Sequence, residues 1–89
     1  MKSDDNVIYV GRKPSMAYVM ALVTQLGTNT DVRVKARGQS ISKAVDVVEI
    51  VRNKFSPDLK VHSINIGTDK LVVEGKEINV SSIEINVKK

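Results

Sequence analysis

Residues 32–46 constrain the fold more than any other part of the chain. From Val32 to Arg37 apolar and basic residues alternate, which is typical of a strand with one apolar and one cationic face. After Gly38 the apolar residues are spaced by three and four, the period of an amphipathic helix. The sequence therefore predicts a strand, a glycine turn and a helix in direct succession. The strand would carry three cations toward the turn: Arg33, Lys35 and Arg37.

Positive charge is concentrated in one part of the chain. The 89 residues have a net charge of +4, but residues 12–43 alone hold six bases and one acid. The other residues hold eight bases and nine acids. Such a concentrated basic region is the footprint expected of a protein with an anionic partner. Aromatic residues are scarce (Tyr9, Tyr18 and Phe55), so base stacking on aromatic platforms is not the expected mode of binding.

The whole chain, residues 1–89, predicts a single α/β domain. Four strands are expected at 7–10, 32–37, 61–67 and 78–87, and two helices at 14–26 and 41–55. The first strand is almost continuously apolar, which indicates a central place in the sheet. The order βαβαββ predicts an α+β two-layer sandwich, a four-stranded mixed sheet with both helices on one face.

The helices should pack through apolar stripes at helical spacing. In the first helix the stripe is Met16, Ala17, Val19, Met20, Val23 and Leu26. In the second it is Ile41, Ala44, Val45, Val48, Val51 and Phe55. Ser40 or Gln39 precedes the second helix, and Ser40 is the better cap because its hydroxyl can accept a hydrogen bond from an early amide.

The last two strands should form an antiparallel hairpin. Residues 68–77 are rich in turn-forming residues and are expected to project from the body as its arm. The apolar phase changes between Val80 and Ile83, which indicates either a bulge or burial on both faces. Residues 1–5 are polar and are expected to be flexible.

Motifs for catalysis or metal binding are not found in the sequence. The single histidine, His62, has no nucleophile near it, and the carboxylate pair Asp4 and Asp5 lies close to the N-terminus. Without cysteine there is no disulfide or thiolate metal site, and the scattered glycines form no nucleotide-binding motif. We therefore expect no enzymatic activity, no metal and no cofactor. The absence of a signal peptide or long apolar run predicts a cytoplasmic protein with no membrane partner.

Two basic turns make the candidate site. Gly11-Arg12-Lys13-Pro14 precedes the first helix and Arg37-Gly38 the second, and both follow strands expected to be parallel, hence on one edge of the sheet. A glycine, two cations and a helix start can bind an anion, although a tight turn with solvated charges explains the first motif equally well. Lys35 and Arg37 are better candidates than Arg33, which could pair with an acid such as Glu84 on a neighbouring strand.

The run from Lys35 to Asn53 closely resembles the Alba family of archaeal chromatin proteins. So does Val10-Gly11-Arg12-Lys13-Pro14 with Met16 and Tyr18, and the similarity extends to Ser82–Ile85, nearly the whole chain. The resemblance implies a homodimer that binds double-stranded DNA, and often RNA, with little sequence preference. It also implies a chromosome-associated protein of the cytoplasm.

The resemblance also assigns roles to residues. Together with the basic turns, it gives these candidate nucleic-acid-binding residues: Arg12, Lys13, Lys35, Arg37, Gln39, Lys43, Lys70 and Lys76. The last two lie on the hairpin arm, which follows the minor groove in the family, and Phe55 would contribute to contacts between dimers. Two departures stand out, since family members commonly have arginine in place of Gln39 and lysine in place of Arg12. That lysine is a proposed acetylation site, so Lys13 becomes the candidate target here.

Three hypotheses follow. The main one is a dimeric, sequence-tolerant protein that coats, compacts or bridges duplex DNA, mainly by neutralising phosphates. The second is an RNA-binding protein, such as an RNA chaperone or a ribonucleoprotein subunit. The third is a small-molecule-binding regulatory domain on the same sheet, which would need a concave apolar pocket.

Overall fold

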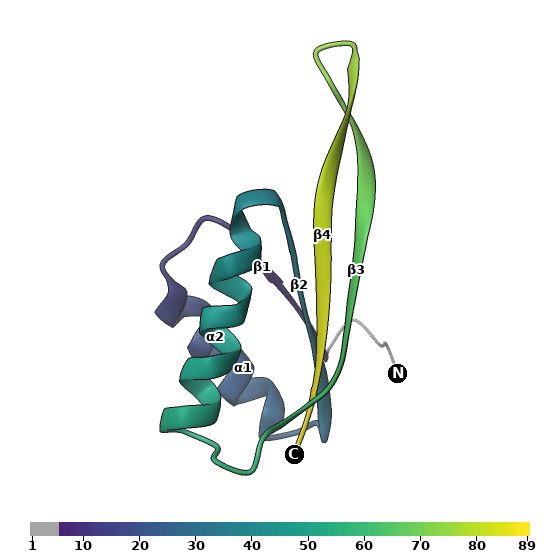
Figure 1. Ribbon diagram of the computed structural model, residues 1–89. Coiled ribbons are helices and arrows are strands. Elements are labelled where there is room, and N and C mark those ends of the chain that lie inside the picture. Colours follow the sequence, from purple (N-terminus) through teal and green to yellow (C-terminus); the bar gives the residue numbers. More distant parts are fainter. Residues whose placement is uncertain (1–5) are drawn as a thin grey trace.

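A computed structural model describes residues 6–89 (Figure 1), so the predictions for residues 1–5, Asp4 and Asp5 among them, lie outside the described part. The elements follow the order βαβαββ. They are β1 (Val7–Val10), α1 (Ser15–Leu26), β2 (Asp31–Arg37), the 3₁₀ turn η2 (Gly38–Ser40), α2 (Ile41–Lys54), β3 (Lys60–Val73) and β4 (Lys76–Lys88). Neither described helix is long and apolar enough to cross a bilayer.

The four strands form one mixed sheet in the order β1-β2-β4-β3. β1 and β2 are parallel, and β4 is antiparallel to both β2 and β3. Both helices cover one face of the sheet and leave the other open (Figure 1). This is the predicted fold class.

The predicted central position of β1 is wrong, because β1 is an edge strand. Its apolar run is less uniform than it looks in the sequence. Ile8 and Val10 face the helices and are buried, whereas Tyr9 between them faces the open side and is 69% exposed. A tyrosine tolerates this position because its ring is apolar and its hydroxyl is polar.

The core lies between the helices and the sheet. β2 contributes Val32, Val34 and Ala36, and α2 buries Ala44, Val47, Val48 and Val51. α1 buries Val19, Leu22 and Leu26. The predicted stripes are therefore partly wrong: Met16, Met20, Val45 and Phe55 are exposed, while Leu22 and Val47 are buried. Because each helix packs against the sheet and the other helix together, its buried face overlaps the predicted stripe only in part.

α2 begins without the predicted serine cap. Ser40 occupies the N-cap position, but its backbone is already helical and its hydroxyl makes no capping hydrogen bond. Instead the 3₁₀ turn leads into the helix, and the amide of Ile41 donates to the carbonyl of Gly38. Gly38 has a left-handed φ of +57°, which allows the chain to turn immediately after β2.

The hairpin of β3 and β4 is longer and more regular than expected. The strands pair without interruption from Ser63 to a two-residue turn, Glu74-Gly75, in which both residues have positive φ. The prediction of a turn-rich segment at 68–77 is thus wrong for most of its length. The strands pair in register from Val80 to Ile83, where a bulge was one of the two predicted explanations. The irregularity lies instead between Val61 and Ser63. The outer half of the hairpin extends past the helices (Figure 1).

Candidate nucleic-acid interface

The two basic turns lie at the same edge of the sheet. β1 and β2 run parallel and Val10 is opposite Ala36, so the turns that follow these strands are neighbours. Arg12, Lys13 and Arg37 are all exposed there. We call these two turns, residues 11–14 and 37–40, the cationic edge.

The first turn is held by hydrogen bonds at Lys13. The amide of Lys13 donates to the hydroxyl oxygen of Tyr18 at 3.1 Å. The carbonyl of Lys13 accepts from the ammonium of Lys43 at 2.7 Å. The backbone is thereby fixed on both sides while the side chains of Arg12 and Lys13 remain free to contact a ligand. Such preorganisation lowers the entropy cost of binding.

The role of Lys43 thus differs from that of a freely exposed cation. Its ammonium joins α2 to the turn before α1. An ammonium has three donors, so two remain for a phosphate. Tyr18 was not predicted as part of the site. Its signal in the sequence is its distance from Lys13, five residues, which places a helical side chain back over the turn that precedes the helix.

The electrostatics around Tyr18 report a positive potential at this turn. Partial burial raises the pKa of the Tyr18 hydroxyl, but the hydrogen-bonding amides of Lys13 and Gly11 lower it, as do the charges of Lys13 and Lys43. The net result is a pKa below the ordinary value of tyrosine. A place that favours a phenolate also favours other anions, such as a phosphate oxygen.

Two of the three cations of β2 are paired with acids on other strands. Lys35 lies opposite Glu84, and their charged atoms are 3.7 Å apart. Arg37 pairs with Asp69 of β3 at 3.8 Å. Arg33 lies opposite Asn86, so the acid considered as its partner, Glu84, instead contacts Lys35. Both ion pairs are partly exposed and therefore contribute little to stability.

The second turn packs closely on β4. A Cβ atom added to Gly38 would lie 3.4 Å from Cγ1 of Val80. Gln39 follows in the 3₁₀ turn and is exposed. An amide at this position can donate to a phosphate or to a base edge but adds no charge.

Comparison with known proteins identifies the family. The family model Alba matches residues 6–68. The chain belongs to the Alba family. The DNA/RNA-binding protein Alba of Picrophilus torridus is 53% identical, with 93% of this chain and 94% of the relative covered. That of Thermoplasma volcanium is 51% identical, with 96% and 97% covered.

Solved structures agree with this Alba assignment. Alba from Thermoplasma volcanium has a TM-score of 0.91 and 50% sequence identity, covering 94% of this chain and 100% of that structure. ALBA1 from Trypanosoma brucei has a TM-score of 0.78 and 30% identity, covering 96% and 69%. The resemblance seen in the sequence is confirmed.

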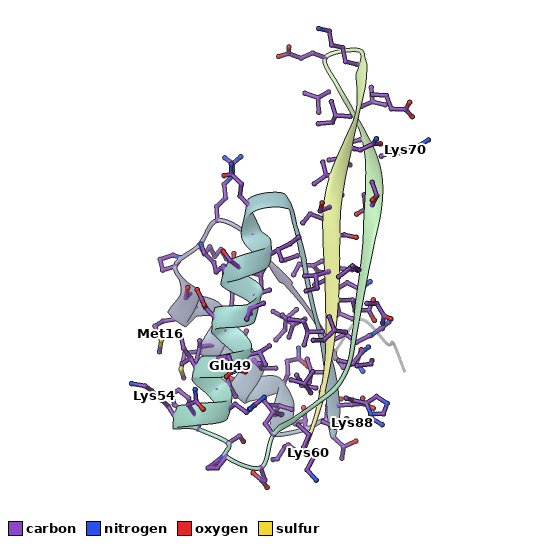
Figure 2. The ribbon with its side chains drawn as sticks, in the orientation of Figure 1. Met16, Glu49, Lys54, Lys60, Lys70 and Lys88 are labelled. Carbon is purple, nitrogen blue, oxygen red and sulfur yellow. The ribbon has the colours of Figure 1, made fainter. Side chains whose placement is uncertain are left out.

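In this Alba chain, the remaining predicted residues lie away from the cationic edge. Lys70 is exposed on the outer hairpin (Figure 2), and Lys76 is exposed at the start of β4. Phe55 caps the far end of α2 and is 46% exposed. The structure therefore brings together five of the predicted residues: Arg12, Lys13, Arg37, Gln39 and Lys43. Lys35 lies on β2, two residues before Arg37.

An exposed apolar pair was missed at the sequence level. Ile64 and Ile66 on the edge strand β3 are 56% and 82% exposed. They lie opposite Ile85 and Ile83 and so share the helix side of the sheet, beyond the two helices. Their alternation is visible in the sequence, but alternation alone does not distinguish burial within one chain from exposure on an edge strand.

Proposed function

We propose that this Alba protein binds duplex DNA through phosphate contacts made by the cationic edge, and that it binds RNA by the same contacts. The observation that carries the proposal is the fixed turn at Lys13, where Arg12 and Lys13 are exposed beside Arg37. The relatives are named DNA/RNA-binding proteins, which supports the same partners here.

Binding by these contacts is tolerant of sequence. Arginine and lysine on turns reach phosphate oxygens, and phosphate contacts orient a protein without reading bases. Lys35 and Lys43 would add to the charge around the edge, Gln39 a hydrogen bond, and Lys70 and Lys76 contacts from the arm. The acids Asp69, Glu74 and Glu77 on the arm make its share of the affinity small.

The working unit that we propose is a homodimer. Ile64 and Ile66 form an exposed apolar pair on an edge strand, a feature that isolated soluble chains avoid. A second copy covering this pair would bury it by two-fold symmetry and supply a second cationic edge. Two edges allow one dimer to coat or bridge DNA, and Phe55 would mediate contacts between dimers. This activity places the protein on the chromosome.

The test is the salt dependence of duplex binding by a triple variant, Arg12→Ala, Lys13→Ala and Arg37→Ala. Binding should weaken equally for duplexes of unrelated sequence. The slope of log K against log salt should become shallower by roughly 0.9 for each phosphate of duplex DNA that the variant no longer neutralises. The control variant is Arg52→Ala with Lys54→Ala, which removes exposed cations from the far end of α2. Unchanged affinity and slope in the triple variant would place the interface elsewhere.

Competition between duplex DNA, duplex RNA and structured RNA at one salt concentration separates the DNA and RNA alternatives.

Acetylation of Lys13 would remove one charge from the edge. Lys13→Gln should therefore reduce the salt slope by the equivalent of one phosphate, whereas Lys13→Arg should preserve it.

The small-molecule alternative lacks support, because the groove on the uncovered face of the sheet is lined by charged and polar groups as well as apolar ones.

A further inference from the structure

The open face of the sheet has a groove of about 430 Å³. The phosphate contacts proposed for the cationic edge do not explain what this groove is for. All four strands contribute to it. Its lining includes Tyr9 from β1, Lys35 and Arg37 from β2, Asn65 and Gly67 from β3, and Glu84 from β4.

Strand register places four of these side chains in one row across the sheet. Tyr9 is opposite Lys35, Lys35 is opposite Glu84, and Glu84 is opposite Asn65. Residues that are opposite one another on paired strands share a face. The row therefore presents an aromatic ring, a cation, a carboxylate and an amide side by side, all toward the open side.

Tyr9 has the properties of a stacking surface. It is 69% exposed on the open face of the sheet. The ammonium of Lys35 lies 5.8 Å from the centre of its ring. This contact orients the ring and leaves most of it accessible, so that a base can stack there without displacing any core side chain.

The chemistry beside Tyr9 suits a base edge better than a phosphate. Glu84 and Asp69 in the groove repel phosphates, but a carboxylate accepts hydrogen bonds from the amino and imino groups of bases. Lys35 and Arg37 neutralise these two acids at 3.7 and 3.8 Å. Gly67 has no side chain, so it leaves space in the groove beside Asn65.

We propose that this groove binds an unpaired nucleobase, stacked on Tyr9, from a strand whose backbone lies on the cationic edge. Arg37 makes the two surfaces continuous, because it lies at the end of β2 on the edge and also lines the groove. The inference rests on the proposed function and adds a substrate class to it, namely nucleic acid with single-stranded segments next to the bound backbone.

The test compares a blunt duplex with a duplex of equal phosphate number that ends in a short single-stranded extension. Tyr9→Ala should weaken binding of the extended duplex by about 5- to 150-fold, the equivalent of one stacked base. Binding of the blunt duplex and the salt slope should not change, since every cation that meets a phosphate is retained. Tyr9→Phe should keep the affinity, and Met20→Ala, an exposed apolar truncation on α1, should have no effect.

An extension whose nucleotides lack bases separates stacking from charge. It should bind the unaltered protein as weakly as the base-bearing extension binds the Tyr9→Ala variant. Ribose and deoxyribose extensions, compared directly, show whether the base comes preferentially from RNA. The proposal is overturned if Tyr9→Ala binds the extended duplex normally or if extensions without bases bind equally well. Binding of the blunt duplex by the triple variant at the cationic edge tests the proposed function separately, because that measurement depends neither on Tyr9 nor on the extension.

Tyrosine fluorescence gives a second readout, because the chain has no tryptophan and only two tyrosines. Stacking on Tyr9 should quench its emission when the extended duplex binds. The extended duplex should quench more than the blunt duplex, and this difference should disappear in the Tyr9→Phe variant, which retains Tyr18 alone. Equal quenching by both duplexes would show that Tyr9 does not contact the extension.

Discussion

At the scale of single residues, the first basic turn depends on Tyr18 and Lys43, which hold the backbone of Lys13 from two sides. The cations of the site could be predicted from the sequence, because the residue type alone gives the charge. It did not show that Lys43 has a structural task, because that hydrogen bond joins residues 30 positions apart. Which cations are free and which are engaged depends on tertiary structure.

Tyr18 should ionise at a lower pH than an unperturbed tyrosine, because amides and lysine charges favour its phenolate more than partial burial opposes it. A folded pKa below the unfolded value means that the folded state binds fewer protons. Unfolding free energy should therefore rise with pH as it passes the folded pKa and level off above the unfolded one. Absorbance titration of phenolate checks this, and Tyr18→Phe should remove the early step. An unaltered titration in that variant would contradict the assignment.

Gly38 should resist substitution, because its φ of +57° is left-handed. Gly38→Ala should cost roughly 1–2 kcal/mol of unfolding free energy, measured by denaturant titration. Asparagine tolerates this conformation better, so Gly38→Asn should cost less. Equal destabilisation by both substitutions would point instead to the contact with Val80 as the cause.

At the scale of secondary-structure elements, alternation and helical spacing predicted the type and order of every strand and helix. The failures have physical causes. Which side of a helix is buried depends on what packs against it, so spacing alone assigned Val45 to the core and missed Val47. Turn-forming residues in the outer hairpin suggested a loop, although cross-strand pairing holds them in strands to Val73.

The outer hairpin should be dispensable for folding. Deleting residues 70–73 and 76–79 together keeps the register and the Glu74-Gly75 turn, and it removes mainly exposed side chains. We expect unfolding free energy to change by less than about 1 kcal/mol, as for surface changes in general. Duplex affinity should fall modestly, since the deletion removes only two lysines. A cooperative unfolding transition in denaturant checks the fold, and disappearance of that transition would show that the arm supports the body.

At the scale of the whole molecule, the two faces of the sheet carry different kinds of surface. The helix side contains the core and, past the helices, the apolar pair Ile64 and Ile66. The open side carries the polar groove, and the cationic edge joins the two. The family resemblance implied the dimer, and the pattern of basic residues already predicted phosphate contacts. Composition argued against stacking because it counts aromatics and does not show that Tyr9 is exposed.

Ile66→Glu should prevent dimerisation, because a charge at an 82% exposed position is tolerated in a single chain but not in an apolar interface. Light scattering after gel filtration should give about twice the 9.8 kDa chain mass for the unaltered protein and the single mass for the variant. Val72→Glu adds the same charge to the same strand at a 75% exposed position and should stay dimeric. A monomeric unaltered protein would contradict the proposal.

The unequal support of the long hairpin predicts a gradient in amide hydrogen exchange. Near the body, β4 is hydrogen-bonded on both sides, by β2 and by β3, whereas from Ser81 toward the turn its only partner is β3. Amides of the outer pairs should therefore open and exchange with solvent much faster than those of β2 at the centre of the core. The arm should thus bend more easily than the body, which would suit the proposed contact between the arm and duplex DNA.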